Sequence, residues 1–270
     1  MPSTVRTRQR RRFRPKLNKR FVATHEGYGV YTVNAFAVRD VAQPDEEFGN
    51  FATQDQFPDL IPEGEIWLSN KNLDAEGVFF IANALTQMKM KAEGVGEDAA
   101  YTAGLNVERR LREKLTGIKF RAGRPHKRVP PRVYVRHYIT LPDKEFPIDV
   151  WVVDGNVVRS FYKTDYTEGG HGYVYRWVPK DQIWVEKDLD RRELPFIVSH
   201  EYIELRLMRD QGIDYDTAHS ICSRVEFKLR KGAGATPLLV SGRGKLTKKE
   251  LPKVTHEDVF EYVLRHYVKK

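Results

Sequence analysis

The stretch 195–230, PFIVSHEYIELRLMRDQGIDYDTAHSICSRVEFKLR, decides the fold of this chain. Apolar residues recur at three- and four-residue spacing on both sides of Gly212, which is the pattern of two amphipathic helices. Asp214 or Asp216 can cap the second helix, and Gly212 favours a turn between the two. The stretch therefore predicts a helical hairpin whose antiparallel helices pack through their apolar faces.

Histidine and glutamate side chains occur in this pattern at positions that can share one face. His200 and Glu204 are four residues apart, so they lie one above the other on the first helix. The turn brings His219 of the second helix near the level of Glu204. Imidazoles and carboxylates that converge in this way are typical ligands of a divalent metal ion.

The run HEYIE at 200–204 has the spacing of the H-E-x-x-H zinc motif, with glutamate at the second ligand position. In that motif the outer residues bind zinc and the glutamate between them is the general base. The outer residues and His219 are therefore the predicted metal ligands, and Glu201 is the predicted catalytic base. His171, in a glycine-rich segment, is a further predicted catalytic residue, either as a fourth ligand or as a group that stabilises a developing oxyanion. The predicted cofactor is Zn²⁺, although iron or manganese would also accept this mixed ligand set.

The same order of sequence blocks occurs twice in the chain. The matching pairs are VNAFAVR (33–39) with VDGNVVR (153–159), IPEGEIWL (61–68) with VPKDQIWV (178–185), and 98–112 with 216–230. The blocks keep their order and a nearly constant spacing. This indicates a tandem duplication that produces a pair of domains.

Each copy is predicted to be α+β, a small antiparallel sheet followed by a helical hairpin, because strand-like runs precede the helices. In the second copy, Asp154-Gly155 between two such runs predicts a β-hairpin turn, and Gly169–Gly172 predicts a flexible loop. The predicted organisation is a basic flexible arm (1–27), degenerate copy one (28–115), a basic proline-rich linker (116–146), copy two with the metal site (147–231), and an extended segment with a C-terminal helix (232–270).

Comparison of the two copies distinguishes the residues that both copies share from the metal-capable residues that occur in copy two. In the block alignment the opposing pairs are Ala84 with His200, Leu85 with Glu201, Met88 with Glu204, Tyr101 with His219, and Phe51 with His171. Glu226 is matched by Glu108, and each precedes an arginine by four residues, so a helical ion pair is expected for both. The metal-capable residues thus occur only in copy two, which predicts one working site.

The net charge of +9 is carried by the start of the chain. Nine basic residues and no acidic residue occur in 1–20, and so dense a basic segment cannot bury enough apolar surface to fold alone. It favours nucleic acid, because arginine binds phosphate without reading sequence; an acidic protein surface, a solubilising tail and a targeting signal are the alternatives. The predicted nucleic-acid contacts are Arg6, Arg8, Arg10, Arg11, Arg12, Arg14, Lys16, Lys19 and Arg20.

The single cysteine, Cys222, excludes an internal disulfide and fits a reducing, cytoplasmic or intracellular compartment. It lies in the apolar pattern of the second helix, which predicts a small buried side chain rather than a reactive thiol. No apolar run approaches the roughly 20 residues that span a bilayer, and no apolar leader occurs at the N-terminus. No membrane partner is therefore expected.

The runs GGHGYVYRWVPKDQIWV, HEYIELRLM and YDTAHSICSRVE resemble a family of uncharacterised proteins found mostly in phages and large viruses. The resemblance covers about 150–230 and, in degenerate form, copy one, and it implies association with a virion and viral assembly partners. His200, Glu201 and the ligand position at Glu204 also resemble, more weakly, the zincin metallopeptidases. That resemblance implies zinc and peptide hydrolysis.

These features favour a metal-dependent hydrolase, a zincin-like peptidase, with its site in copy two. The alternative is a non-enzymatic virion or nucleoprotein component that binds nucleic acid through the arm. A solvated polar helix face without metal is a third interpretation of the same charged residues. The hydrolase interpretation is based on Glu201 and an open metal position, whereas the interpretation as a structural component is based on the basic arm.

Overall fold

The computed structural model describes residues 16–42, 46–71, 73–120, 130–143 and 145–231, together with Val259 and Val263. The described chain forms two halves, which we call the first half (16–120) and the second half (130–231). Each half has two strands, a short helix, two further strands and two long helices, in that order. This confirms the predicted α+β class and the duplicated arrangement.

The elements of the two halves correspond one to one. The first half contains β1 (Arg20–His25), β2 (Tyr28–Val33), α1 (Ala35–Val41), β3 (Phe51–Thr53), β4 (Glu65–Ser69), α2 (Leu73–Ala92) and α3 (Glu97–Thr116). The second half contains β5 (Tyr134–Leu141), β6 (Ile148–Val153), α4 (Gly155–Phe161), β7 (Gly169–His171), β8 (Gln182–Glu186), α5 (Leu194–Gln211) and α6 (Tyr215–Arg230), and a 3₁₀ turn (Pro131–Val133) precedes β5.

Both four-stranded sheets are mixed, with the orders β1-β2-β4-β3 and β5-β6-β8-β7. The outer pairs of strands are antiparallel, but β2 pairs with β4 and β6 pairs with β8 in parallel. The antiparallel sheet that the sequence predicts is therefore wrong at its centre. The reason is that α1 or α4 follows the second strand and carries the chain back before the fourth strand begins, as a parallel pair requires.

Asp154 and Gly155 begin α4 instead of a β-hairpin. The Asp154 side chain accepts a hydrogen bond from the Asn156 N–H over 3.1 Å, and the helix continues to Phe161. Aspartate before glycine suits both structures, and the buried face of the residues that follow decides in favour of the helix. The loop predicted at 169–172 is also wrong over its first three residues, which form β7 and pair with β8.

The first strand of each sheet lies ahead of the predicted start of its copy. β1 lies within the predicted arm, 1–27, and places Arg20 opposite Thr32 of β2. β5 lies within the predicted linker, 116–146, and pairs with β6. Residues 1–15, 121–129 and 232–258 lie outside the described residues, whereas Val259 and Val263 are helical and buried in the core of the second half.

The helical hairpin predicted from 195–230 is present as α5 and α6. Gly212 ends α5 in the left-handed conformation, with a φ of 65°, and Asp214 caps α6 by accepting a hydrogen bond from the Thr217 N–H. Cys222 is buried, as predicted, in the apolar cluster between these helices and the second sheet. Full burial of each aliphatic side chain in such a cluster contributes roughly 1.5–3 kcal/mol, so the packed hairpin is a firm support for side chains on its polar face. No helix in the described ranges is both long enough and apolar enough to cross a bilayer.

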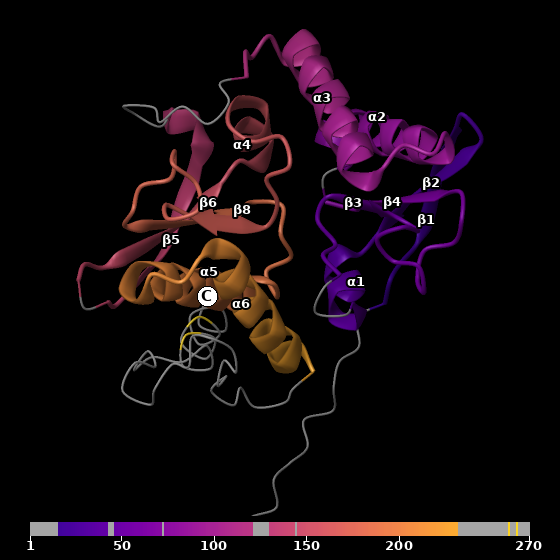
Figure 1. Cartoon of the computed structure of the whole chain (residues 1–270). Helices are drawn as coiled ribbons and strands as arrows, with labels where there is room; N and C mark the ends of the chain where they lie inside the picture. The colour runs from indigo at the N-terminus through magenta and orange to yellow at the C-terminus, as the bar shows by residue number, and fades with distance from the viewer. Residues whose placement is uncertain are drawn as a thin grey trace, which may run out of the picture.

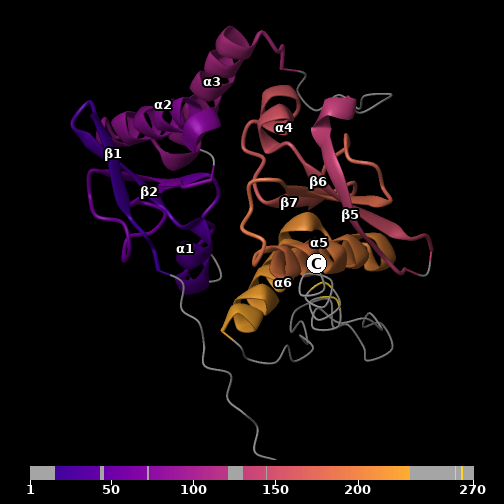
Figure 2. The same ribbon diagram turned by 180° about the vertical axis from the view of Figure 1, so that it is seen from behind.

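The two halves lie side by side in opposite orientations. In Figure 1, α2 and α3 lie above the first sheet, whereas α5 and α6 lie below the second. The short helices are also inverted, with α1 low and α4 high, and the view from behind agrees (Figure 2). The halves are thus related by an approximate two-fold axis, so equivalent surfaces face each other.

Reciprocal buried ion pairs join the halves. Arg39 of α1 lies 3.3 Å from Glu193 at the start of α5, measured from Nη1 to Oε1. Arg159 of α4 lies 2.8 Å from Glu76 of α2, measured from Nε to Oε1. All four side chains are at least nine-tenths buried, and each half supplies one arginine and one glutamate. Separation of the halves would therefore break both ion pairs and expose an arginine and a glutamate on each half.

Candidate metal centre between the halves

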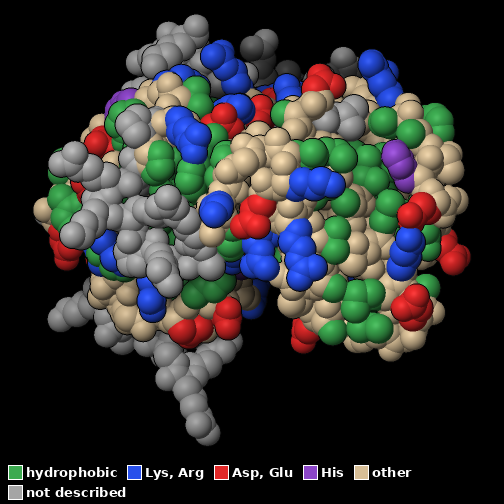
Figure 3. Space-filling model, turned by 90° about the horizontal axis from the view of Figure 1, so that it is seen from above, with side chains coloured by type: hydrophobic (Ala, Val, Ile, Leu, Met, Phe, Trp, Pro, Cys, Tyr) green, Lys and Arg blue, Asp and Glu red, His purple; other side chains and the backbone are tan. Residues whose placement is uncertain are grey.

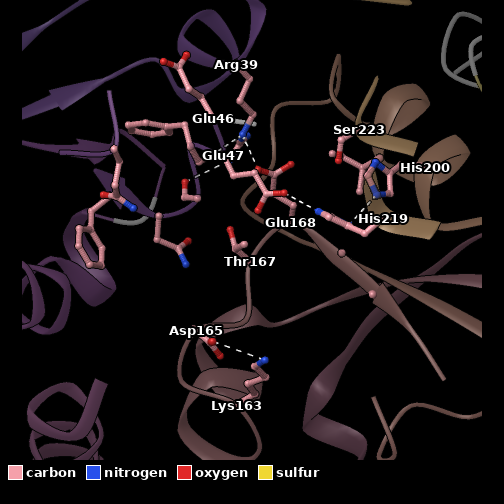
Figure 4. Close-up of a pocket in the computed structure, with 18 of the residues that line it drawn as sticks. Arg39, Glu46, Glu47, Lys163, Asp165, Thr167, Glu168, His200, His219 and Ser223 are labelled. Atoms are coloured by element: carbon pink, nitrogen blue, oxygen red, sulfur yellow. Dashed lines mark hydrogen bonds and ion pairs between the residues drawn. The ribbon is translucent and has the colours of Figure 1, made fainter. Parts of the chain in front are cut away.

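A cavity of about 400 Å³ lies where the two halves meet. The second half lines it with β7, α5 and α6, and the first half lines it with α2, α3 and the segment between α1 and β3. Figure 4 shows the end at which His200 and His219 lie beside Glu47 of the first half. Glu201 and Glu204 also face this cavity. Because both halves form the walls, neither half alone contains the complete cavity.

The three predicted metal ligands converge at this end of the cavity. His219 Nδ1 lies 2.9 Å from Glu204 Oε2 and 3.2 Å from His200 Nε2. His200 Nε2 lies 3.4 Å from the same carboxylate oxygen. Ligand atoms of a tetrahedral zinc site, with bonds of about 2.0 Å, are separated by about 3.3 Å. These three residues, which we call the His–Glu–His cluster, therefore have the spacing that a small divalent ion needs.

Each imidazole of the cluster directs its outer nitrogen at another carboxylate. His200 Nδ1 lies 2.9 Å from Glu226 Oε2, and His219 Nε2 lies 2.5 Å from Glu47 Oε1. A carboxylate only accepts, so the outer nitrogen of each neutral ring carries the hydrogen. The inner nitrogens then present lone pairs to each other and to Glu204 Oε2. Three acceptor atoms with no donor among them require a cation between them, which is either a proton or a metal ion.

The pKa values of the cluster residues are shifted in the direction that favours positive charge on the imidazoles. Burial would lower the pKa of His200, but hydrogen bonds to the carboxylates of Glu204 and Glu226 raise it well above its usual value. Burial opposes the shift of His219 as well, and the hydrogen bonds to Glu204 and Glu47 raise its pKa to about 9. Burial acts against ionisation of Glu204, yet its hydrogen bonds to the surrounding imidazoles lower its pKa. The surrounding carboxylates therefore favour positive charge at the cluster.

His171 holds the carboxylate of Glu204 from β7. The imidazole is fully buried, and its Nε2 lies 3.0 Å from Glu204 Oε1. The Tyr173 N–H donates to His171 Nδ1 over 3.2 Å, so the hydrogen of the neutral ring is on Nε2. Burial lowers the pKa of His171 and keeps the ring neutral. In this arrangement His171 leaves Glu204 Oε2 free for the cluster and can position that carboxylate, and with Glu201 and Glu204 it also forms a second group of possible ligands.

Glu201 lies beside the cluster, against the backbone of β7. A Cβ atom on Gly169 would lie 3.0 Å from Glu201 Oε1 and 2.9 Å from Ile197 Cγ2, so only glycine allows this close approach. A carboxylate oxygen of Glu201 lies within 4.8 Å of the ligand atoms of His171 and Glu204. Burial and then the charge of Glu204 raise the pKa of Glu201 to about 8. A carboxyl group with this pKa can accept or release a proton near neutral pH.

The first half keeps the hydrogen-bond chain of this site without its imidazoles. Asn83 Nδ2 donates to Glu108 Oε2 over 2.7 Å, and Gln87 Nε2 donates to Asn83 Oδ1 over 2.7 Å. By their contacts, the equivalent pairs are Asn83 and His200, Gln87 and Glu204, Tyr101 and His219, and Glu108 and Glu226. Amides and a phenol replace the cluster, so the described residues of the first half contain no comparable set of metal ligands at these positions.

This correspondence shifts the sequence alignment of α2 by one residue. The Arg112 guanidinium lies 4.3 Å from the centre of the Phe79 ring, and Arg230 lies 4.4 Å from that of Phe196. These matched contacts place Asn83, and not Ala84, opposite His200. In the sheets, Thr53 and His171 both pair with an isoleucine of the neighbouring strand, so Thr53, and not Phe51, lies opposite His171.

A second acidic cluster, Glu76, Glu186 and Asp188, is occupied by an arginine. Arg159 Nη2 lies 2.5 Å from Glu186 Oε1 and also contacts Glu76. The guanidinium supplies the positive charge there, so this cluster is a structural ion-pair network.

The predicted nucleic-acid contacts are divided by the boundary of the described residues. Arg6, Arg8, Arg10, Arg11, Arg12 and Arg14 lie outside it. Lys19 is part of the folded first half, where it pairs with Glu65 and lies 4.1 Å from the centre of the Tyr31 ring. Arg20 begins β1, and Lys16 is exposed. Seen from above, further Lys and Arg side chains lie near the junction of the two halves (Figure 3).

Glu47 is the residue of the site that sequence reasoning missed. It lies 172 positions from His219 in the chain, in the short segment between α1 and β3. No periodicity or motif links two residues at such a separation. Only the two-fold arrangement of the halves brings them together.

Comparison with known proteins supplies no further assignment. No protein-family model, no curated protein and no solved structure matches this chain significantly.

Proposed function

We propose that the protein is a divalent-metal-dependent hydrolase, with zinc the preferred ion, and that its centre is the His–Glu–His cluster of the second half. The observation that supports this most directly is the convergence of two imidazole lone pairs and a carboxylate oxygen within 3.4 Å of one another. Their outer hydrogen-bond partners are carboxylates, an arrangement common around metal-binding histidines.

Each residue of the site has a separate role in the proposed hydrolysis. His200, Glu204 and His219 would hold the ion, at the end of the cavity. A bound ion would supply Lewis acidity for water activation. Glu201 accepts the proton of the attacking water and returns it to the leaving group, for which its raised pKa and its place beside the cluster are suited. His171 keeps the carboxylate of Glu204 in position.

A peptide is the substrate class that this surface favours. β7 is the edge strand of its sheet, and its Gly169 and Gly170 line the cavity beside Glu201. Edge strands can bind extended peptides through main-chain hydrogen bonds, although Gly169 and Gly170 are themselves buried, against Glu201 and Tyr175 respectively. We therefore infer hydrolysis of a peptide bond, as the weak resemblance of HEYIE to the zincin motif also suggests.

Metal content is the first test of this proposal. Elemental mass spectrometry of the purified chain should find about one zinc per molecule, and a His200→Ala/His219→Ala double variant should contain none. A Glu201→Gln variant should keep the metal and lose hydrolytic activity. No metal in the wild type, even after zinc is offered, would contradict the proposal.

The basic start of the chain supports a second function that is independent of the metal. We propose that 1–20 binds nucleic acid, on the basis of its nine basic residues without any acidic residue. If the metal test fails, a non-enzymatic nucleoprotein or virion component is the remaining proposal.

A further inference from the structure

We propose that the first half completes the metal centre of the second half by means of Glu47, which acts as a positioning residue for His219. This inference rests on the proposed metal function. It gives the degenerate half a specific chemical role, which is to hold one of the ligands supplied by the other half.

Glu47 reaches the centre from the segment between α1 and β3. Its Oε1 lies 2.5 Å from His219 Nε2, the nitrogen that points away from the cluster (Figure 4). With this nitrogen bonded to a carboxylate, the hydrogen of the neutral ring is fixed on Nε2 and the lone pair on Nδ1 is directed at His200 and Glu204. The Tyr215 ring packs against the same imidazole, with 5.3 Å between ring centres. Glu47 and Tyr215 thus determine the tautomer and the plane of His219.

The two histidines of the cluster have matching supports of different origin. His200 Nδ1 is bonded to Glu226, which comes from α6 of the same half. His219 Nε2 is bonded to Glu47, which comes from the other half. Loss of such an outer carboxylate typically lowers metal affinity by about 10–100-fold. The carboxylate bonded to His219 Nε2 is thus supplied by the first half, whereas the carboxylate bonded to His200 Nδ1 is supplied by the second.

The same contact exists in mirror form at the other end of the cavity. Asp165 of the second half occupies the position that corresponds to Glu47 of the first half. Its Oδ2 accepts a hydrogen bond from the Tyr101 hydroxyl over 2.9 Å. Tyr101 is the counterpart of His219. The duplication thus provides a matched control, because one carboxylate contacts a metal-capable ring and the other contacts a phenol.

A purely structural ion pair would behave differently. The Glu47 side chain is 62% exposed and that of His219 is 29% exposed, and solvent screening makes such a pair a small contributor to folding. Removal of Glu47 should therefore change the metal-free protein little. A large loss of metal affinity without a comparable loss of stability is the signature of a positioning role.

The test uses the full chain with Glu47→Ala, Glu47→Asp and the control Asp165→Ala. Zinc affinity is measured by competition with a chelator, the Tm of each metal-free variant is recorded, and the imidazole nitrogen chemical shifts of His219 are measured by NMR. Glu47→Ala should weaken zinc binding about 10–100-fold and shift the tautomer of His219, with a Tm close to that of the wild type. Glu47→Asp should recover part of the affinity, and Asp165→Ala should bind zinc as the wild type does.

The outcomes separate this inference from the proposed function. Zinc binding by Glu47→Ala with unchanged affinity, or an equal loss in Asp165→Ala, would overturn the role of Glu47 and leave the metal centre intact. A wild-type chain that binds no zinc would overturn both proposals.

Discussion

His200 of α5 and Asn83 of α2 make the same hydrogen bond in the two halves of the molecule. His200 Nδ1 lies 2.9 Å from Glu226 Oε2, and Asn83 Nδ2 lies 2.7 Å from Glu108 Oε2. An amide nitrogen and an imidazole nitrogen can both donate to the helix carboxylate, but only the imidazole has a second nitrogen with a lone pair for a metal ion. The two halves thus share one scaffold and differ in what it presents to the cavity.

This relationship predicts that a second centre can be built in the first half. The variant Asn83→His/Gln87→Glu/Tyr101→His should increase the zinc content from about one to about two per chain. Glu108 and Asp165 already occupy the places of the outer carboxylates, whereas Thr53 stands in the place of His171, so the new centre should bind zinc more weakly than the native one. Elemental analysis of the purified variant measures this, with Asn83→His/Tyr101→His, which lacks the new carboxylate, as the weaker-binding control. A folded triple variant that still contains one zinc would refute the assigned equivalence.

Replacement of His171 should show whether its hydrogen bond to Glu204 positions this ligand. His171→Leu removes the donor and should lower zinc affinity by about 10–100-fold. His171→Gln keeps an N–H donor of similar reach and should retain most of the affinity. Zinc titration of both variants makes the comparison; equal losses in the two would indicate that the imidazole ring itself is needed, as expected of a ligand.

Arg159→Met should destabilise the protein by about 3–5 kcal/mol, because the carboxylates of Glu76 and Glu186 would stay buried without their shared guanidinium. Urea unfolding of the metal-free protein measures the loss. Lys89→Ala is the control, since Lys89 and its partner Glu26 are each about half exposed and their pair should contribute less than about 1 kcal/mol. A similar small effect for both variants would mean that the buried network does not hold the halves together.

Cys222 should not react with thiol reagents in the native protein. Its side chain is fully buried, and this burial raises the pKa of the thiol well above its usual value. Because the thiolate is the reactive form, modification should follow global unfolding. Mass spectrometry after brief exposure to iodoacetamide, with and without urea, measures this. Rapid labelling without urea would contradict the burial of this helix face.

Deletion of residues 1–15 should weaken nucleic-acid binding and leave zinc binding unchanged. The deleted segment contains six arginines, so the slope of log affinity against log salt should fall in magnitude by up to about 5. Fluorescence anisotropy with a labelled oligonucleotide over a range of salt measures both quantities. An unchanged affinity and slope would remove the arm from consideration as a nucleic-acid contact.

The helices and their convergence could be predicted from sequence because they depend on short spacings. The four-residue interval from His200 to Glu204 and the turn at Gly212 bring the three predicted ligands together with no long-range information. The duplication was equally accessible, since it is a property of the sequence itself. The α+β class followed from the order of strand-like and helix-like runs.

The features that sequence reasoning missed depend on choices between local alternatives or on tertiary contacts. Asp154 caps a helix, although aspartate before glycine is also a strong turn signal, and this choice changes the central strand pairing from antiparallel to parallel. The one-residue shift at Asn83 could be detected only from matched contacts. Glu47 could not be predicted, because no local pattern records which segment of one half will face a histidine of the other.

The reciprocity of Arg39 with Glu193 and Arg159 with Glu76 has the form of a symmetric homodimer interface enclosed in a single chain. Two identical subunits with such an interface would carry two identical centres, and any substitution would alter both at once. Covalent fusion removes that constraint, because each copy can change alone while the other keeps its composition. Such freedom permits amides at Asn83 and Gln87 where the other half has the imidazole of His200 and the carboxylate of Glu204.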